Sequence, residues 1–330
     1  MRILIAGFGT IARRHLKNIR QIEPASHLTI WRQHTSSEDA EARALAETQV
    51  FSVEEALRGR PDAALVTGPA SSHMATGLIL AKAGIPLFIE KPLSHTMAGV
   101  DTLLNVCRAN GVPLMVGYNF RFHQPLQILR SALIEGSIGR PLYLHAEVGQ
   151  YLPDWRPHKD YRLTASAKKE LGGGAVLELS HELDCARWLM GEVASVQATM
   201  AKVSDLEIDV EDTAQITLRF RNGAIGSVHM NMVQRVPTRT CRIVGAEGTF
   251  VWDAMASCVS RYLVSNKTWE ILHSEPNADR NQMYVEEMRH FLECAKTRCT
   301  PLITGEDGKA VLEVALAAKR SAEDGQMITL

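Results

Sequence analysis

The first dozen residues constrain the fold of this chain most strongly. Arg2–Ala6 is an almost uninterrupted apolar run, which predicts a buried strand. It leads directly into a Gly-x-Gly-x-x-Ala turn and then into a helical stretch that reaches about Ile22. In this setting the first glycine permits a tight turn, the second lets the backbone approach a pyrophosphate, and the alanine lets helix and strand pack closely. The sequence therefore predicts a dinucleotide site whose residues include Gly7, Gly9, Thr10, Ile11 and Ala12.

The residue after the second predicted strand, Leu28–Trp31, bears on the choice of cofactor. An acidic residue at this place would bind the ribose 2′-hydroxyl of NAD, but the chain has Arg32 there. Arg32 and the polar residues 33–36 suit the additional 2′-phosphate of NADP. We therefore expect a preference for NADP. The use of NAD, or of either cofactor, stays an alternative.

Helices and strands alternate as far as residue 117. Helices are predicted over 37–47, 53–58, 71–83 and 96–110, and strands over 62–67, 86–89 and 113–117. This alternation predicts a Rossmann-type, doubly wound parallel sheet, and we assign it to a domain of residues 1–120. The loop after strand 62–67 leaves its carboxyl end, so Thr67, Pro69 and His73 are predicted to lie beside the cofactor.

A Glu-Lys-Pro sequence, Glu90-Lys91-Pro92, follows the strand predicted over 86–89. Open α/β sheets bind their ligands at the carboxyl ends of the strands, and Pro92 has no N–H to continue a strand pairing. Lys91 is therefore expected on a fixed backbone at the rim of the cofactor crevice, next to Glu90. The alternative is a solvated lysine that ends an ordinary strand.

The second half of the chain, residues 121–330, is predicted to form a separate α+β domain. Its clearest signal is a hairpin that turns at Asn222-Gly223, and two further hairpins follow before two C-terminal helices. The expected architecture is a mostly antiparallel open sheet with helices on one face. If the other face is apolar, it needs a partner, and we expect a homo-oligomer, a dimer or a tetramer, formed through this sheet.

One predicted helix of the second half, Ala175–Met190, carries a candidate acid–base residue. Its apolar residues form one stripe, while Glu178, His181 and Asp184 fall on the other side. Histidine suits proton transfer because its pKa lies near the working pH; the alternative is a surface histidine paired with acidic neighbours. A zinc site is not predicted, because Cys185 stands where a second histidine would be required.

Composition narrows the possible partners and location. With 36 basic and 37 acidic residues the net charge is −1, so no global charge recruits nucleic acid or a membrane surface. The six cysteines are scattered and show no zinc spacing, which is typical of reduced thiols. The chain shows neither a signal peptide nor an apolar run of membrane-spanning length. We expect a cytoplasmic protein.

Taken together and in this order, the glycine turn, Glu90-Lys91-Pro92 and the histidine helix resemble the Gfo/Idh/MocA family of glucose–fructose oxidoreductase, inositol dehydrogenases and related sugar dehydrogenases. Further matching stretches are Pro69-x-x-x-His73, Asn119-x-Arg121-Phe122-His123-x-Pro125, Glu211-Asp212-Thr213 and Gly245-x-Glu247-Gly248. The resemblance implies an NAD(P)-dependent enzyme in which Lys91 lies beside nicotinamide and substrate and His181 is the acid–base residue. It also implies that Asn119 contacts the cofactor, and Arg121 and Asp184 the substrate. Members commonly carry an aspartate four residues before the histidine; Leu177 stands there, so Glu178 is expected to orient His181.

This resemblance implies the oxidation of a secondary alcohol, or its reverse. His181 would take the hydroxyl proton, and Lys91 would hydrogen-bond the same oxygen and stabilise its developing charge. The chain has no Tyr-x-x-x-Lys, so the catalytic solution of short-chain dehydrogenases does not apply.

The cation- and aromatic-rich loop 151–170 is the candidate substrate-binding segment. Aromatic faces suit sugar rings, and arginine suits carboxylate or phosphate. We expect an anionic sugar, either nucleotide-linked or a sugar acid, bound by Tyr151, Trp155, Arg156 and Tyr161. Three alternatives remain: the loop is an ordinary solvated surface, the substrate is a neutral polyol or inositol, or the protein is a non-catalytic NADP-binding regulator like the fungal galactose-gene repressor in this family.

Overall fold

The computed structural model describes residues 1–32 and 39–330, and these divide into two compact units. Unit 1 comprises Met1–Asn119 and Asn281–Leu312, and unit 2 comprises Phe120–Arg280 and Glu313–Leu330. The first boundary falls next to the predicted one at residue 120. The observed division nevertheless differs from the predicted second domain of 121–330, because residues 281–312 return to unit 1.

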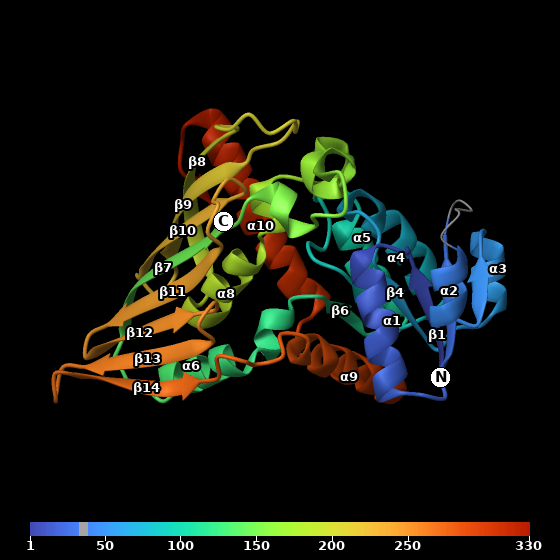
Figure 1. Ribbon diagram of the computed structural model, residues 1–330, viewed down its shortest axis with the longest axis horizontal. Coiled ribbons are helices and arrows are strands. Elements are labelled where there is room, and N and C mark those ends of the chain that lie inside the picture. The colour runs from blue at the N-terminus through green and yellow to red at the C-terminus, as the bar shows by residue number, and fades with distance from the viewer. Residues whose placement is uncertain (33–38) are drawn as a thin grey trace. The chain divides into compact units, whose positions relative to one another are not determined.

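Unit 1 is built on a six-stranded parallel sheet (Figure 1). Its strand order is β3-β2-β1-β4-β5-β6. The chain adds β2 and β3 on one side of β1 and then β4, β5 and β6 on the other, which is the doubly wound arrangement predicted from the alternation. The predicted fold class is therefore confirmed for this unit. Strand β3 was not predicted, because its three residues carry no apolar run. The strands are β1 (Arg2–Ala6), β2 (His27–Trp31), β3 (Thr48–Val50), β4 (Ala63–Val66), β5 (Leu87–Ile89) and β6 (Leu114–Val116).

The helices of unit 1 follow the predicted positions closely. The helix predicted from residue 96 begins only at Val100, because Gly99 before it has a φ of +82°. The start predicted at Ser37 for another helix lies outside the described residues. The helices are α1 (Thr10–Ile22), α2 (Asp39–Leu45), α3 (Val53–Arg58), α4 (His73–Lys82) and α5 (Val100–Ala109).

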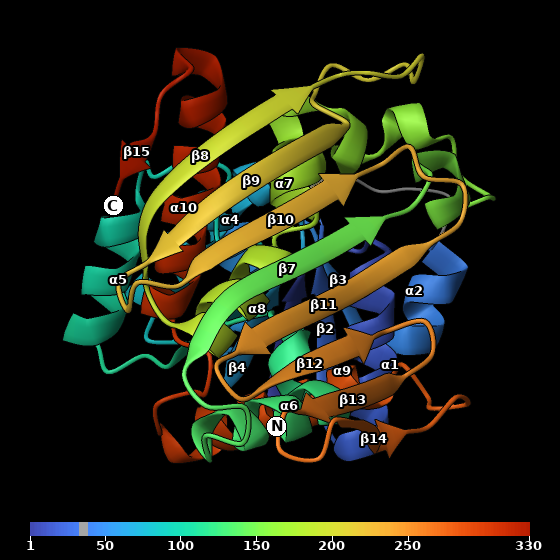
Figure 2. The ribbon, with the colours of Figure 1, turned by 90° about the vertical axis from the view of Figure 1, so that its left-hand side faces the viewer.

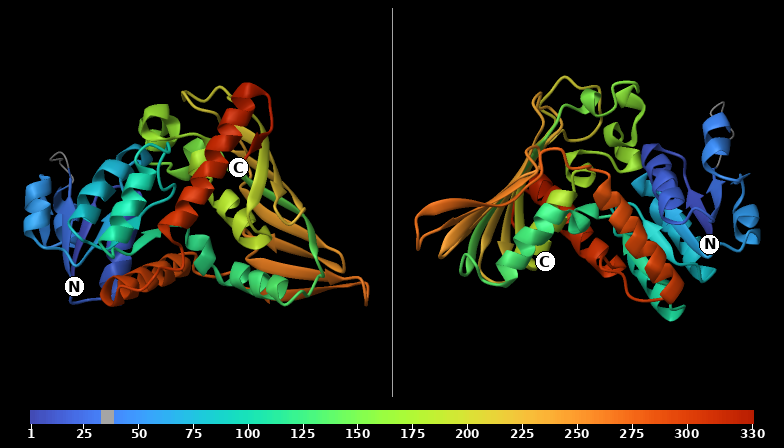
Figure 3. Two further views of the ribbon diagram at one scale, coloured as in Figure 1. Left: turned by 180° about the vertical axis from the view of Figure 1, so that it is seen from behind. Right: turned by 60° about the horizontal axis from the view of Figure 1, so that its bottom comes forward.

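A late helix, α9 (Gln282–Thr297), completes unit 1 beside α1 (Figure 3). Asn281 donates a hydrogen bond to Asn18 at 2.8 Å, and the rings of Phe291 and Phe88 lie 5.5 Å apart. The segment after α9 then reaches the outer strand β6, where the N–H of Val116 donates to the carbonyl of Ile303 at 3.1 Å. These contacts explain why residues 281–312 belong to unit 1.

Unit 2 contains a nine-stranded sheet of order β14-β13-β12-β11-β7-β10-β9-β8-β15 (Figure 2). Neighbouring strands are antiparallel except β7 and β10. The three predicted hairpins are β9–β10, β11–β12 and β13–β14, which confirms the predicted fold class. The strands are β7 (Pro141–Gly149), β8 (Val193–Ala201), β9 (Thr213–Phe220), β10 (Ile225–Asn231), β11 (Thr238–Gly245), β12 (Gly248–Asp253), β13 (Cys258–Leu263), β14 (Thr268–Ser274) and β15 (Ile328–Thr329).

Three helices pack against this sheet. Helix α6 (Gln124–Ile134) contacts β12–β14, while α7 (Ala175–Glu178) and α8 (His181–Met190) contact β7, β9 and β10. A last helix, α10 (Gly305–Asp324), is shared by the two units. The prediction of a single helix over 175–190 is wrong, because the structure has two helices there, α7 and α8, separated by Leu179 and Ser180. Leu179, with φ −101° and ψ +22°, ends α7, and α8 begins after Ser180.

The opposite face of the sheet carries a row of exposed and half-buried side chains that the strand register places side by side. The row crosses six strands and alternates with buried residues such as Leu144 and Ile243; its members are Ile225, Tyr143, Val244, Thr249, Tyr262 and Trp269. Trp269 is 57% exposed and Ile225 44% exposed. The homo-oligomer expected through this sheet stays a prediction.

Among the helices that the structure describes, none has the length and apolar character needed to cross a bilayer.

Candidate active site

The segments that carry the predicted cofactor residues of unit 1 follow the strands of its parallel sheet (Figure 1). They follow the carboxyl ends of β1, β2, β4, β5 and β6, and these ends meet at the same edge because the strands are parallel. The segments are the glycine turn 7–12, Arg32, the loop 67–73, Glu90 with Lys91, and Asn119. Asn119 is only 2% exposed.

The two glycines of the turn differ in what they do. Gly7 has a φ of +107°, and a Cβ added to it would meet Thr67 Oγ1 and Gly68 N at 3.0 Å, so the fold itself requires glycine. Gly9 has a φ of −82°, which any residue adopts, and an added Cβ would meet nothing within 4 Å among the described residues. This open space adjoins the N-terminus of α1, whose N–H groups and dipole attract phosphate. The turn therefore fits a pyrophosphate.

Arg32 lies next to this turn. Its Nη2 donates to Gln49 Oε1 at 2.7 Å, and its guanidinium carbon lies 5.5 Å from the centre of the Phe8 ring. Phe8 is part of the glycine turn. The structure thus brings together Arg32 and the predicted pyrophosphate site, while the polar residues 33–36 lie outside the described residues.

Glu90 and His73 hold the backbone around Lys91. Glu90 Oε1 lies 2.7 Å from Nε2 of the fully buried His15, and Glu90 Oε2 accepts the N–H of Lys91 at 3.3 Å. The ring nitrogens of His73 lie 3.0 Å and 2.9 Å from the carbonyls of Pro92 and Gly68, and burial lowers the pKa of His73. These contacts give Glu90 and His73 a structural role. Their contact with a cofactor, and that of Thr67 and Pro69, stays a prediction.

In unit 2, Glu211 anchors the segment that leads to His181. Its carbonyl accepts the N–H of Ala175 at 3.0 Å, and its Oε1 accepts the N–H of Val176 at 3.3 Å, so it satisfies the start of α7. Lys319 Nζ lies 3.1 Å from the same carboxylate. Gly174, with a φ of +104°, lets the backbone pass so close that a Cβ would meet Glu211 Oε1 at 2.5 Å. Glu178 ends this helix, and its predicted orienting role toward His181 stays a prediction.

His181 is the first residue of α8 and lies beside an aromatic and cationic cluster. Its ring centre is 4.9 Å from that of Phe120, which in turn lies 5.7 Å from the ring of Trp252. The Arg239 guanidinium stacks over Phe120 at 4.6 Å and pairs with the buried Glu182 at 2.7 Å and 3.2 Å. The sequence prediction missed these neighbours because they come from separate segments of the chain; only the motif around Asn119 and Arg121 pointed to Phe120.

A second histidine, His123, lies in the same cluster, 5.7 Å from the ring of Trp252. Burial, with the positive charge of Arg239 and other nearby groups, lowers the pKa of His123 to about 4. His123 is therefore neutral at physiological pH and is poorly suited to cycle a proton there.

Two predicted substrate residues, Arg121 and Asp184, pair with each other. Arg121 Nη2 and Nε donate to the Asp184 carboxylate at 2.7 Å and 3.1 Å, and the two side chains are 6% and 1% exposed. This buried, two-pronged ion pair ties the turn at 119–122 to α8. Their contact with substrate stays a prediction.

Within the part of the chain that the structure describes, no three His, Cys, Asp or Glu side chains gather as a metal site requires.

The loop 151–170 is folded into four short 3₁₀ turns. Trp155 Nε1 donates to the carbonyl of Gln150 at 3.0 Å, the Tyr161 hydroxyl accepts the N–H of Glu207 at 3.2 Å, and the Tyr151 ring lies under Arg235 at 3.5 Å. The cavity between Trp155, Arg156 and Tyr161 holds only about 10 Å³, far too little for a sugar. The aromatic residues pack within unit 2, while Arg156 is exposed.

Comparison with known proteins shows the family to which this fold belongs. Residues 1–118 match the family model described as "Oxidoreductase family, NAD-binding Rossmann fold", and residues 126–251 match the GFO/IDH/MocA C-terminal domain. The myo-inositol 2-dehydrogenase of Thermotoga maritima is 30% identical over 100% of this chain and 98% of its own length. The WlbA dehydrogenase from Bordetella pertussis, solved with NADH and UDP-GlcNAcA, is 27% identical with a TM-score of 0.84, covering 100% of this chain and 98% of that one. A levoglucosan dehydrogenase solved with NADH and levoglucosan shares the fold, at 19% identity and a TM-score of 0.89, over 100% of this chain and 99% of that one.

Proposed function

This chain belongs to the Gfo/Idh/MocA family of oxidoreductases, and from that premise we propose that it transfers a hydride between a nicotinamide dinucleotide and an alcohol carbon of a sugar or sugar derivative. The observation that carries the proposal is the carboxyl edge of the unit 1 sheet, where the open space at Gly9 and the backbone-fixed Lys91 follow β1 and β5. A nicotinamide bound there would accept or supply the hydride.

The remaining chemistry is proton transfer, which we assign to two side chains. The Lys91 ammonium would donate a hydrogen bond to the substrate oxygen and stabilise negative charge that develops on it. The His181 imidazole would take the hydroxyl proton, or return it in the reverse reaction. In support, the Glu90–His15 contact fixes the backbone of Lys91, and the Arg121–Asp184 pair fixes the helix that His181 begins.

The cofactor part of the proposal is tested at Gly9. Gly9→Val should leave the chain folded and lower the free energy of unfolding by no more than about 1 kcal/mol, because a Cβ there meets no neighbour within 4 Å among the described residues, although valine is a poorer helix N-cap than glycine. It should raise the Kd of NAD(P)H at least about tenfold, since the side chain fills the space beside the N-terminus of α1. Fluorescence titration with the reduced cofactor measures this. An unchanged Kd in the folded variant would remove the glycine turn from the cofactor site.

We further propose that NADP is preferred over NAD, on the strength of Arg32 beside the glycine turn. Arg32→Ala should raise KM for NADP about 10–100-fold, the value of one lost charge-assisted contact to phosphate, and change KM for NAD little. Steady-state kinetics with both cofactors measures the effect. A wild-type enzyme with a clear preference for NAD would refute this assignment.

For the substrate, we propose an anionic sugar, nucleotide-linked or acidic. The exposed Arg156 and the neighbouring His158 and Lys159 support this class, as does the UDP-GlcNAcA bound to the WlbA dehydrogenase. A neutral polyol is the second candidate, favoured by the similarity to a myo-inositol 2-dehydrogenase. The two differ in salt dependence: turnover of an anionic substrate should weaken as ionic strength rises, whereas turnover of a polyol should not.

A further inference from the structure

Two cysteines meet at the C-terminal end of α9. The helix ends at Thr297, and Arg298 adopts a left-handed φ of +59°, which turns the chain back. This turn brings Cys299 Sγ to 3.1 Å from Cys294 Sγ. In such a helix end the residue after the left-handed one often makes an apolar contact with the last turn of the helix. Here that contact consists of two thiols.

The two thiols have different environments. Cys294 is buried, and burial, together with the neighbouring Cys299, raises the pKa of Cys294 to about 12. Cys299 is exposed, and hydrogen bonding with the Thr297 side chain, and then with Cys294, lowers its pKa. Because the thiolate is the reactive form, Cys299 is the nucleophile of the pair and Cys294 is the resolving cysteine.

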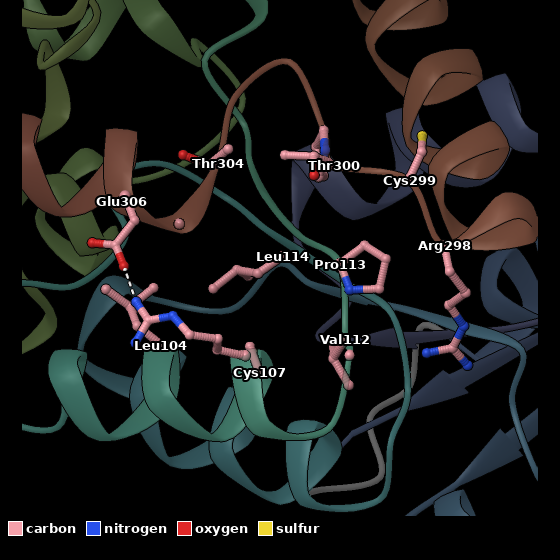
Figure 4. A pocket seen from close by; sticks show the side chains of 14 residues that line it. Leu104, Cys107, Val112, Pro113, Leu114, Arg298, Cys299, Thr300, Thr304 and Glu306 are labelled. Atoms are coloured by element: carbon pink, nitrogen blue, oxygen red, sulfur yellow. Dashed lines mark hydrogen bonds and ion pairs between the residues drawn. The ribbon is translucent and has the colours of Figure 1, made fainter.

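Cys299 lines a pocket of about 310 Å³ on the surface of unit 1 (Figure 4). The pocket contains two guanidinium groups, Arg298 and Arg108, the second of which pairs with Glu306 at 2.8 Å. Pro113 and Leu114, at the amino end of β6, form its floor, so it lies at the opposite edge of the sheet from the cofactor residues. Cys299 is itself exposed, so small oxidants can reach it, and the pocket beside it is separate from the candidate active site.

We propose that Cys294 and Cys299 form a peroxide-sensitive dithiol that closes to an intramolecular disulfide. The Cys299 thiolate attacks one oxygen of hydrogen peroxide, the O–O bond breaks, and hydroxide leaves, so that Cys299 becomes a sulfenic acid. Cys294 sulfur then attacks Cys299 sulfur, the S–O bond breaks, and hydroxide leaves with the proton of Cys294 as water. Overall, two thiols lose two electrons and two protons, and peroxide becomes two waters. The sulfurs need to approach by only about 1 Å to reach bonding distance.

The other cysteines are poorly placed for this reaction. Cys107 lines the same pocket but is buried, and burial raises its pKa to about 11. Cys185 and Cys241 are buried, and burial raises the pKa of both. Cys258 is partly exposed and serves as the matched control.

The test is peptide mapping of the reduced full-length protein after treatment with hydrogen peroxide and alkylation of the remaining thiols. Trypsin cuts after Lys296 and Arg298, so peptides 290–296 and 299–309 separate unless a disulfide joins them. We expect the joined peptide, lighter by two hydrogens than the sum of its parts, and its disappearance after reduction with dithiothreitol. Cys258→Ser should behave as wild type.

Single variants identify the order of events. Cys294→Ser should stop at the sulfenic acid of Cys299, which a 1,3-diketone traps, and Cys299→Ser should slow thiol loss at this end of α9 at least about tenfold. Circular dichroism confirms that each variant is folded. Peroxide treatment of wild type that over-oxidises Cys299 without joining the peptides would overturn the proposal, as would an unchanged rate in Cys299→Ser.

Discussion

Replacing Lys91 by methionine should lower kcat by about 10²–10³, the usual cost of removing one hydrogen-bond donor from a developing oxyanion. Methionine keeps the length of the side chain and removes the charge. His181→Asn should lower kcat by about 10²–10⁴, the usual contribution of a general base. In both variants the Kd of NAD(P)H should stay near that of wild type, because neither change alters the open space at Gly9.

Two matched controls separate these effects from a general loss of charge. Lys82→Met changes an exposed lysine at the end of α4, and His27→Asn changes an exposed histidine at the start of β2; both lie at the amino-terminal edge of the sheet, away from the cofactor residues. Neither should change kcat noticeably. Turnover within twofold of wild type in both Lys91→Met and His181→Asn would end the assignment of these residues.

Replacing Asp184 by alanine should lower the free energy of unfolding of unit 2 by about 3–5 kcal/mol, the cost of breaking a buried ion pair on one side. The reason is the burial of Arg121, whose side chain is only 6% exposed and would lose this carboxylate. Urea denaturation followed by tryptophan fluorescence reports on this unit, because Trp155, Trp188, Trp252 and Trp269 lie in it and only Trp31 lies in unit 1.

A double variant distinguishes a structural pair from a substrate contact. Arg121→Met combined with Asp184→Leu should recover much of the lost stability, since neither charge then remains buried. Asp205→Ala, at an exposed aspartate of the same unit, should change stability by less than about 0.5 kcal/mol. If Asp184→Ala raised KM for the sugar while leaving stability unchanged, the substrate role expected from the family resemblance would be favoured instead.

The sequence predicted those features that short segments determine on their own. The strand, glycine turn and helix of residues 2–22 are contiguous, so their hydrophobic pattern and glycine spacing are sufficient to predict them. The same holds for Lys91, whose place at the end of β5 follows from an apolar run closed by a proline. The confirmed fold class rests on the repetition of such local signals along the chain.

Features that depend on distant residues could not be predicted in this way. The interruption between α7 and α8 accompanies the anchoring of α7 by Glu211, more than thirty residues later in the chain. Helix α9 returns to unit 1 through contacts with Phe88 and Asn18, which no local pattern reveals. The family resemblance implied a substrate contact for Arg121 and Asp184, which stays a prediction. Their pairing with each other could not be predicted, because they lie 63 residues apart in the chain.

The most direct test of the proposed function is turnover itself. Initial rates, followed through the absorbance of the reduced nicotinamide, should be measured with NADP and NAD against nucleotide-linked sugar acids, free sugar acids and neutral inositols. We expect turnover of at least one of these, faster with NADP, weakened by salt for an anionic substrate, and lost in Lys91→Met. Tight binding of the dinucleotide with no turnover of any sugar would contradict it and would indicate a nucleotide-binding regulator.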